Sequence, residues 1–471
     1  MRPDQHCSSL EQTFSKKLDA IIADSFAGSF ADSGAGKLQN GLAVGYSGGL
    51  DSTVLLDLAI NYCRRAKISL HAFHVHHGLS PNADAWLDHC RTVCVTGEVS
   101  FHAERIQVSR DSGDGVEASA RKGRYEALGR MAKDTGTPLI LAAHHQDDQA
   151  ETLLLQLLRG SGVAGMSGMD VCHRAPNLFG HDQVMLGRPL LSEKRATLEA
   201  YASQRGLSYI EDESNTDQRY LRNAIRHSVM PVLDTLSPGY SERIARSATH
   251  FQAAQDLMLE VAQQDFASCS VDTGLDIAAM RELSPARKDN LFRHWFSRAG
   301  VRMPTTSRLK EMQNQLFEGR EDARITVHHD TVAIHRYKNI VYLSAQNAGM
   351  AEQDQLREFV WESQDHIHFP EFAGSLYFDT AEHGLDASWL KRQPLTMHLR
   401  RGGERLKLAE NRPTRDMKSH YQSLQIPFWQ RERLPYVSIG KDLLFAAGVG
   451  MQSRFCQSEL AAGISLRWVF D

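Results

Sequence analysis

The sequence predicts an α/β fold, in which a parallel sheet with helices on both faces is followed by a mainly helical domain and a small α+β domain. Two observations lead to this fold class. Strand-like and helix-like segments alternate through the first half of the chain, and from about Arg219 helical periodicity continues with no clear strand before residue 323. The chain has 471 residues, which is too long for one hydrophobic core.

The alternation is regular in the first half. Short apolar runs typical of buried strands are each followed by apolar residues spaced three and four apart, as on a helix. Strands are predicted at 42–46, 68–76, 101–108, 138–143 and 184–186, and helices at 51–66, 82–95, 116–132 and 147–158. Parallel strands place their carboxyl ends at one rim of the sheet, where ligands bind in such folds. We expect the polar clusters that follow the first, second and fourth strands to meet there.

Composition shifts along the chain suggest the domain boundaries. Residues 24–40 are rich in Gly, Ser and Ala and predict a loop, and residues 345–357 are polar and resemble a linker. In the segment 287–298, apolar residues at helical spacing predict core packing. We predict an N-terminal extension at 1–40, a catalytic domain at 41–218, a helical substrate domain at 219–344, a linker at 345–358 and a C-terminal domain at 359–471.

Charge and cysteine content favour a cytoplasmic protein. The net charge is −4, so any nucleic-acid surface must be a local patch. The seven cysteines are scattered and odd in number, which favours a reducing compartment over a disulfide framework. Cys90 and Cys94 could form a metal or redox pair, or two thiols on one buried helix face. The N-terminus lacks an apolar signal core, and we expect no membrane-spanning segment.

A glycine turn, Ser47-Gly48-Gly49-Leu50-Asp51-Ser52, joins the first strand to the first helix of the alternation. It lacks the lysine of a Walker loop and the spacing of a dinucleotide fingerprint. Two glycines let the backbone approach a phosphate, and the first N–H groups of the helix face such an anion. Asp51 would repel phosphates unless a cation lay between them, which implies Mg²⁺. The alternative is an ordinary strand-to-helix turn with a capping residue.

A second polar cluster, HHQDDQAET at 144–152, follows the fourth predicted strand. Asp148 and Glu151 are three apart on the predicted helix and share a face, and Asp147 and Glu151 are four apart. With His145, these groups could hold Mg²⁺, accept a proton or bind an ammonium group. The alternatives are an acidic helix N-terminus that complements the helix dipole, or a zinc site built from the neighbouring histidines.

The glycine turn resembles the S-G-G-x-D-S signature of the PP-loop, or N-type, ATP pyrophosphatases, which cleave ATP between the α- and β-phosphates. Three further stretches are similar to the tRNA(Ile)-lysidine synthase family: HHQDDQAET, the segment 212–231 with its D-x-S-N and R-N motifs, and RRGGERLKL…IPFWQRERLPYV at 400–437. The resemblance covers residues 41–437.

This resemblance implies that ATP adenylates the wobble cytidine of a tRNA(Ile) with a CAU anticodon and that L-lysine then displaces AMP, with Mg²⁺ as the metal. It implies catalytic roles for Asp51, His145, Asp148, Glu151 and Arg121, ATP binding by residues 47–52, and Mg²⁺ binding by Asp51 and Asp148. Arg121, with Arg124, could instead belong to an exposed helix surface. Alternative functions are a PP-loop enzyme that thiolates tRNA, which needs reactive cysteines, and a tRNA-binding protein that has lost catalysis. The oligomeric state is not predicted.

Two basic segments are candidates for holding the tRNA. Arg219, Arg222 and Arg226 recur at helical spacing, with Asn223 among them, and Arg forks suit RNA phosphates. Residues 391–433 carry 11 Lys or Arg against 4 Asp or Glu, among them Arg400, Arg401 and Arg405. The aromatic residues of this second segment, Phe428 and Trp429 among them, could meet RNA or form the domain's own core.

Overall fold

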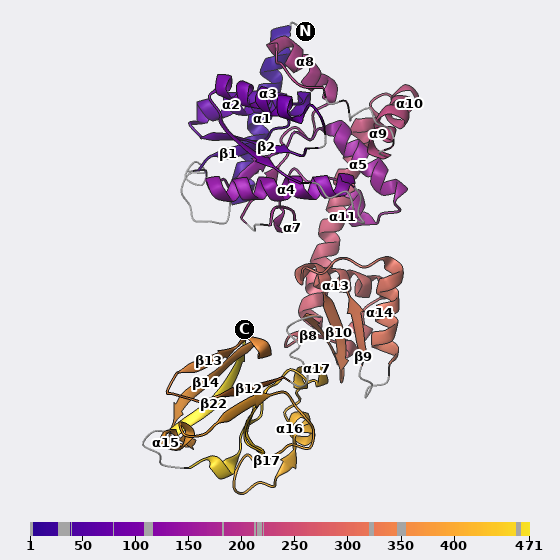
Figure 1. The fold of residues 1–471 in the computed structure, drawn as a ribbon. Coiled ribbons are helices and arrows are strands. Elements are labelled where there is room, and N and C mark those ends of the chain that lie inside the picture. The colour runs from indigo at the N-terminus through magenta and orange to yellow at the C-terminus, as the bar shows by residue number, and fades with distance from the viewer. Residues whose placement is uncertain are drawn as a thin grey trace. The chain divides into compact units, whose positions relative to one another are not determined.

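The computed structural model describes residues 3–26, 38, 40–78, 80–107, 116–180, 183–211, 213, 219, 221–319, 325–345, 355–457 and 463–471. The chain divides into two compact units, residues 1–257 and 258–471, and the boundary falls within α11 (Tyr240–Cys269). Figure 1 shows the predicted order of a sheet with helices, then helices, then a strand-rich C-terminal part. Each unit is described by itself.

The first unit is built on a six-stranded sheet in the order β3-β2-β1-β4-β6-β5. Its strands are β1 (Leu42–Gly45), β2 (Leu70–His76), β3 (Ser100–Arg105), β4 (Leu139–Leu141), β5 (Cys172–Arg174) and β6 (Met185–Gly187). All neighbours pair in parallel except β5, which lies antiparallel to β6 at the edge. The parallel sheet is therefore confirmed. The edge strand β5 was not predicted, because its sequence CHR carries no strand-like apolar pattern.

The helices of this unit follow the expected alternation, with ends that differ from the predicted ones by a few residues. They are α1 (Pro3–Phe26), α2 (Leu50–Ala66), α3 (Ala83–Gly97), α4 (Val116–Thr135), α5 (Gln146–Leu158), α6 (Val163–Met166), α7 (Pro176–Phe179), α8 (Arg195–Arg205), α9 (Leu221–Ala224) and α10 (Met230–Leu236), with a π-helical turn at Ile225–Val229. Two apolar clusters lie against the sheet and form its core.

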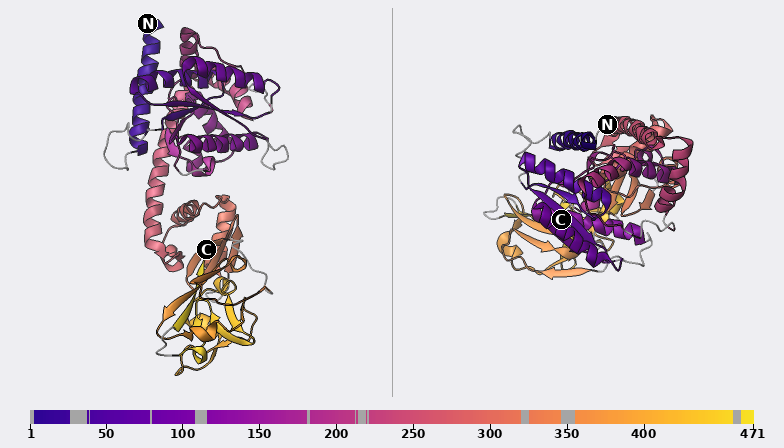
Figure 2. Two further views of the ribbon diagram at one scale, coloured as in Figure 1. Left: turned by 60° about the vertical axis from the view of Figure 1, so that its left-hand side comes forward. Right: turned by 90° about the horizontal axis from the view of Figure 1, so that it is seen from above.

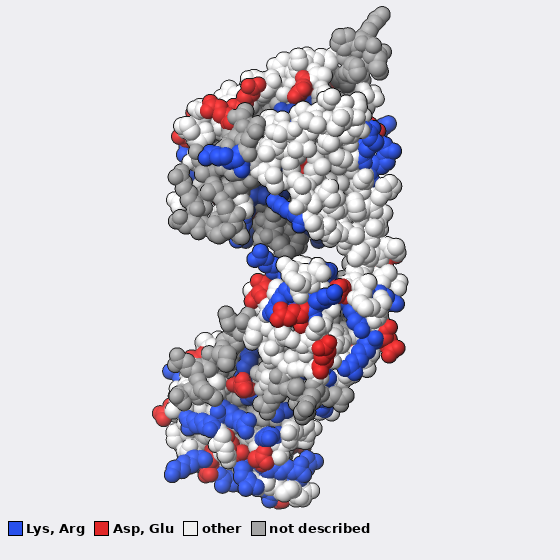
Figure 3. All heavy atoms as spheres, turned by 90° about the vertical axis from the view of Figure 1, so that its right-hand side faces the viewer, with Lys and Arg blue, Asp and Glu red and all other residues white. Residues whose placement is uncertain are grey.

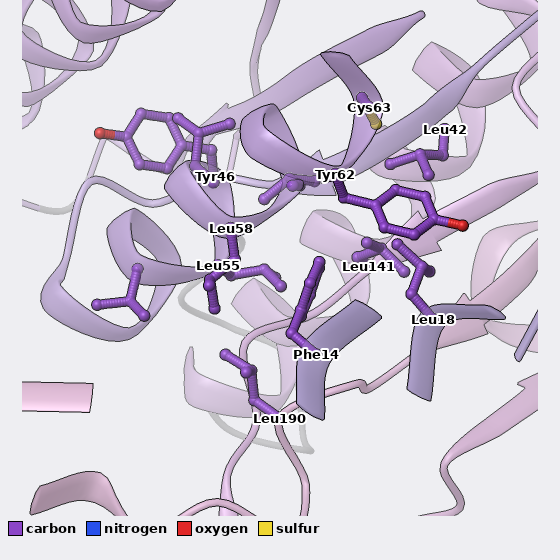
Figure 4. Close-up of a cluster of buried hydrophobic side chains, with 14 of the residues drawn as sticks. Phe14, Leu18, Leu42, Tyr46, Leu55, Leu58, Tyr62, Cys63, Leu141 and Leu190 are labelled. Atoms are coloured by element: carbon purple, nitrogen blue, oxygen red, sulfur yellow. The ribbon is translucent and has the colours of Figure 1, made fainter. Parts of the chain in front are cut away.

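Helix α1 belongs to this core. Phe14 and Leu18 are fully buried and point into a cluster that includes Leu55 and Leu141 (Figure 4). The helix lies along the side of the sheet domain as the indigo ribbon of Figure 2. Tyr62 Oη donates a hydrogen bond of 2.6 Å to Asp19 of α1 and so ties it to α2. The domain boundary drawn at residue 40 stays a prediction.

The second unit begins with helices packed on one face of a five-stranded antiparallel sheet, β7-β8-β11-β10-β9. The helices are α12 (Ile277–Arg281), α13 (Pro285–Arg298) and α14 (Thr306–Glu318), and the strands are β7 (Ser270–Val271), β8 (Gly274–Asp276), β9 (Ile325–His329), β10 (Val332–Tyr337) and β11 (Ile340–Ala345). The apolar stripe of α13 is buried as predicted. The expectation of no strand before residue 323 was wrong, because β7 and β8 are too short to carry a pattern.

The rest of the second unit is a strand-rich domain. One sheet has the order β12-β16-β19-β20-β21 and another β13-β14-β22-β15. Their strands are β12 (Leu356–Phe359), β13 (His366–Phe369), β14 (Gly374–Ala381), β15 (Leu385–Asp386), β16 (Leu395–His398), β19 (Tyr436–Ile439), β20 (Asp442–Ala446), β21 (Gly450–Met451) and β22 (Gly463–Phe470). Short elements complete it: β17 (Arg405–Leu406), β18 (Arg415–Asp416), α15 (Ala387–Leu390), α16 (Met417–Ser423) and α17 (Phe428–Arg431). One apolar cluster joins the two larger sheets. Among the described residues, every helix is too short or too polar to cross a bilayer.

Candidate active site

The glycine turn leaves β1 at the carboxyl edge of the sheet and enters α2. Gly48 has φ +86°, and a Cβ at this position would lie 2.6 Å from Ile210 Cδ1 and 2.8 Å from Cys90 Sγ. Only glycine fits this conformation and this space. The Ile210 N–H donates a hydrogen bond of 2.9 Å to Gly48 O. This bond connects the turn to a segment that lies far from it in the chain.

The N-terminus of α2 is open to an anion. Gly49 occupies the N-cap position and no side chain caps the helix. The Ser47 and Ser52 hydroxyl oxygens are 3.0 Å apart, and Ser52 also donates to Gly49 O at 2.9 Å. The uncapped N–H groups, the positive end of the helix dipole and the two hydroxyls together form a site for phosphate oxygens. The predicted ATP-binding residues thus lie together in one turn.

The carboxylate of Asp51 faces the start of α5. Its Oδ2 lies 3.6 Å from His145 Nε2 and 3.9 Å from Arg195 Nη1. Its Oδ1 is buried and has no hydrogen-bond partner among the described residues. A buried carboxylate oxygen without a donor is costly unless a cation or a ligand donor meets it. Asp51 therefore fits Mg²⁺, which prefers carboxylate and phosphate oxygens.

His145 is the N-cap residue of α5, and Asp148 lies in the first turn of that helix. Asp148 Oδ2 accepts a hydrogen bond of 3.0 Å from the His145 N–H and lies 3.3 Å from Nε2 of the same residue. Burial alone would lower the pKa of His145, but contact with Asp51 and the surrounding carboxylates outweigh it and raise the pKa. Burial would likewise raise the pKa of Asp148, but the charges of His145, His144 and Arg222 lower it. Both shifts favour the charged forms, imidazolium for His145 and carboxylate for Asp148.

Two arginines from the following segment cover the carboxylates of α5. Arg222 donates to Asp148 at 3.1 Å and to Glu151 at 2.9 Å. Arg226 donates to the same two carboxylates, at 3.1 Å to Asp148 Oδ1 and 3.0 Å to Glu151 Oε2. Asp148 and Glu151 thus share a face of α5, as their spacing predicts. Arg222 and Arg226 were predicted to bind tRNA, and the structure places both guanidinium groups on these carboxylates.

A cluster of arginines surrounds His144. Arg188 Nε donates to His144 Nδ1 at 3.3 Å, and Arg188 Nη1 donates to Asp170 O at 2.8 Å. Burial, together with the charges of Arg188, Arg124 and Arg222, lowers the pKa of His144. Arg121 is exposed on α4 with its guanidinium 5.2 Å from the Tyr125 ring centroid. Its catalytic role stays a prediction.

Three residues that line this site were missed at the sequence level: Arg188, Arg195 and Ile210. Arg188 and Arg195 frame the segment RPLLSEKR that follows β6, so the rule that ligands meet strand ends could have found them. The Arg195 N–H donates to Asp147 at 3.2 Å, and its side chain approaches Asp51. Ile210 carries no chemical signal, since its role is to pack against the glycine turn.

The other predicted side chains lie apart from this cluster in the chain. Arg400, Arg401 and Arg405 belong to the C-terminal domain, where Arg401 and Arg405 line a cleft of about 670 Å³. The Arg401 and Gly402 N–H groups donate to the Glu404 carboxylate, at 2.5 and 2.8 Å, which fixes the loop. Figure 3 shows many Lys and Arg side chains on the C-terminal part of the chain. Arg219 and Asn223 lie close to Arg222 in the chain. Their predicted role in tRNA binding stays a prediction.

Reactive thiols and a metal cluster are the alternative chemistries that the sequence left open. Cys90 and Cys94 are fully buried on α3, and burial raises the pKa of both to about 12. Such thiols are unreactive at neutral pH. Within the described part of the chain, no three His, Cys, Asp or Glu side chains converge as metal ligands.

The strand, the SGGLDS turn and the uncapped helix define a PP-loop ATP pyrophosphatase domain, and a family profile described as PP-loop domain matches residues 10–233. Profiles for the TilS substrate binding domain and the TilS substrate C-terminal domain match residues 275–342 and 395–468. The tRNA(Ile)-lysidine synthase of Ralstonia nicotianae is 38% identical over 425 residues, covering 87% of this chain and 88% of that protein. That of Alkalilimnicola ehrlichii is 36% identical over 416 residues, covering 88% and 91%. The chain belongs to the tRNA(Ile)-lysidine synthase family.

Proposed function

We propose that this chain joins L-lysine to C2 of the wobble cytidine, position 34, of a tRNA(Ile) with the anticodon CAU. ATP is consumed, and lysidine, AMP and pyrophosphate are formed, which changes decoding from AUG to AUA. The observation that carries the proposal is that Asp51, in the first turn of the uncapped helix α2, and Asp148 of α5 both approach His145 Nε2, at 3.6 and 3.3 Å, in a chain of this family.

In the first step the cytosine O2 attacks the α-phosphorus of ATP, and the bond to the bridging oxygen of pyrophosphate breaks. The N–H groups of α2 and the hydroxyls of Ser47 and Ser52 would hold the leaving pyrophosphate. Asp51, whose Oδ1 has no hydrogen-bond donor among the described residues, would hold Mg²⁺, which neutralises phosphate charge when bound. Asp148 would join it as a ligand only once Arg222 and Arg226 release its Oδ1. The neighbouring carboxylates raise the pKa of His145 and so favour its protonated form, which adds positive charge beside Asp51.

In the second step the ε-amine of lysine attacks C2 and AMP leaves. The ammonium must first lose a proton, and we infer that Asp148 or Glu151 of α5 accepts it. Arg222 and Arg226 engage both carboxylates in the structure. A lysine ammonium needs the same oxygens, so at least one guanidinium must move away before the substrate binds there. Departure of Arg222 would remove one of the charges that lower the pKa of Asp148 and make Asp148 a better base.

The arginines of the C-terminal domain and Arg219 would contact the tRNA backbone, and Arg222 or Arg226 would do so only after leaving the carboxylates of α5. The cleft lined by Arg401 and Arg405 and the basic composition of residues 391–433 support the first surface. We place the protein in the cytoplasm, because its described cysteines are free thiols and its substrates are tRNA and ATP. The buried state of Cys90 and Cys94 disfavours tRNA thiolation, which needs reactive sulfur ligands or donors.

The test is transfer of labelled lysine to RNA. The protein is incubated with ATP, Mg²⁺, labelled L-lysine and unmodified tRNA(Ile) bearing CAU, and initiator tRNA with the same anticodon serves as the control substrate. Alkali-stable label in the isoleucine tRNA, lost in Asp51→Ala and Asp148→Ala, is expected. AMP release that depends on tRNA but leaves no label would contradict lysine as the nucleophile. Alkali-labile label would indicate an ester on the tRNA end instead.

A further inference from the structure

Trp429 connects the C-terminal domain to the preceding sheet of the same unit. Its ring stacks on His335 of β10 with centroids 4.2 Å apart and planes inclined by 8°. It also contacts Tyr342 of β11 at 5.4 Å and meets Tyr337 edge-on at 6.1 Å. Phe428 adds an edge contact to His335 at 5.9 Å. Aromatic contacts of this kind contribute beyond the area that they bury.

The sheet face under Trp429 is the one that the helices leave open. Alternate residues of β10 point to opposite faces, and Ile334 belongs to the core formed with α13 and α14. His335 therefore points the other way, yet it is only 5% exposed. Its two ring nitrogens are engaged, Nδ1 with Thr326 Oγ1 at 3.1 Å and Nε2 with Ser344 Oγ at 2.8 Å. The imidazole is thus a fixed platform for the indole.

A polar contact accompanies the stack. Arg431, two residues after Trp429, donates from Nη2 to Tyr337 Oη at 3.4 Å. The same guanidinium donates from Nε to Ile426 O at 2.7 Å, and its side chain is 7% exposed. Helix α17 therefore presents an indole and an anchored guanidinium to one sheet, and neither group is needed for the chemistry proposed above.

We propose that Trp429 is a positioning residue, which holds the C-terminal domain on the aromatic face of the β9–β11 sheet so that one tRNA meets both as a single rigid surface. The proposal rests on the proposed function, in which this unit helps to bind tRNA. A rigid connection raises the effective concentration of the second surface once the first is bound. Loss of the stack would weaken binding of a full-length tRNA and leave the chemical steps unchanged.

The test compares two RNA substrates and three variants of the full chain. Lysine transfer is measured with full-length tRNA(Ile) and with an isolated anticodon stem-loop, which is too short to contact a second domain. Trp429→Ala removes the stack, and Trp429→Phe keeps an aromatic ring. Trp389→Ala is the matched control, since Trp389 stacks on Phe455 within the C-terminal domain at 5.5 Å. Dissociation constants for the same RNAs are measured by filter binding.

Trp429→Ala is expected to raise KM and Kd for full-length tRNA about tenfold with kcat unchanged, and to leave the stem-loop constants unchanged. Trp429→Phe restores most of the affinity. An unchanged KM and Kd in Trp429→Ala, an equal loss with both RNAs, or an equal loss in Trp389→Ala would overturn the proposal. If the wild-type chain binds tRNA but transfers no lysine, the proposed reaction fails, while the Kd comparison still decides the role of Trp429.

The stack itself has a separate readout in the absence of RNA. Burial, with a contribution from His328, lowers the pKa of His335 to about 4. Removal of the indole exposes the ring, so the pKa measured by NMR should rise toward 6.5 in Trp429→Ala and stay low in Trp389→Ala. An identical titration of His335 in wild type and Trp429→Ala would show that the indole does not cover it.

Discussion

Arg226 and Glu151 meet through two hydrogen bonds, from Nε to Oε1 and from Nη2 to Oε2, and the Glu151 side chain is only 1% exposed. A buried carboxylate of this kind is tolerated only with its partners in place. The same guanidinium reaches Asp148, so one arginine joins the two carboxylates that the proposed reaction needs. We therefore expect changes to this pair to affect both the stability of the fold and the proposed reaction.

Glu151→Ala should lower the free energy of unfolding by about 3 kcal/mol, because it removes one of the two buried carboxylates that pair with Arg222 and Arg226 and leaves only Asp148 to balance two guanidinium groups. The measurement is urea denaturation followed by fluorescence and circular dichroism. Glu199→Ala is the control, since Glu199 forms an exposed pair with Arg195. Its loss should change the free energy by less than about 1 kcal/mol. Equal effects of the two variants would contradict a buried cluster.

Asp51→Asn should reduce tRNA-dependent AMP release by about 100-fold or more, because the side chain no longer offers an anionic ligand beside the phosphates. The residual activity should need more Mg²⁺ for half-saturation. Both are measured by titrating Mg²⁺ at saturating ATP. Asp88→Asn, which changes an exposed acid paired with Arg91, serves as the control. A variant with wild-type activity and an unchanged Mg²⁺ requirement would remove Asp51 from the metal site.

The pKa values of the adjacent His144 and His145 should differ from the ordinary value of 6.5 in opposite directions. The pKa of His145 is raised, so its contribution to stability is complete below 6.5 and is lost as the pH rises through the folded-state pKa. The pKa of His144 is lowered, so its contribution is present above 6.5 and is lost as the pH falls. NMR titration of the two rings tests this, with His144→Gln and His145→Gln for assignment. Coincident titration of the two rings is the contrary result.

Local signals were enough to predict the sheet, the glycine turn and the shared face of Asp148 and Glu151. Each depends on residues close together in the chain, and strand order then places their ends at one rim. The turn also matched a known signature, which brought in the family. Those parts of the fold and of the site could therefore be predicted from the sequence.

Contacts between segments that are distant in the chain could not be predicted from the sequence. A basic stripe such as Arg222 and Arg226 reads equally well as an RNA surface or as a set of ion-pair partners, and only the fold shows where the guanidinium groups point. Residues 1–40 were predicted only as an N-terminal extension, and nothing in their sequence indicated that Phe14 of helix α1 is buried in the core. The stack of Trp429 on His335 joins residues 94 apart in the chain, which periodicity does not reveal.

Substitution of exposed arginines in the C-terminal domain should weaken tRNA binding through charge alone. Arg401→Ala and Arg405→Ala each remove one cation from the cleft. Each should raise the Kd for tRNA a few-fold at low salt and lower the slope of log Kd against log salt by about one if it neutralises one phosphate. Arg357→Ala, an exposed arginine outside the cleft, is the control. If the slope for Arg401→Ala and Arg405→Ala equals that of the Arg357→Ala control and of wild type, the RNA surface lies elsewhere.

Gly48→Ala and Gly49→Ala should separate the folding role of the glycine turn from its role in binding. Gly48 has φ +86° and its added methyl group would meet Ile210 and Cys90, so we expect a loss of about 2 kcal/mol in the free energy of unfolding. Gly49 has φ −72°, and the nearest atom to its added methyl group would be Ser47 Oγ at 3.6 Å. Gly49→Ala should therefore fold with nearly wild-type stability, yet bind ATP more weakly because the methyl group faces the phosphate site. Urea denaturation and calorimetric titration with ATP measure the two effects. Wild-type ATP affinity in Gly49→Ala would mean that the phosphates do not approach the backbone at this turn.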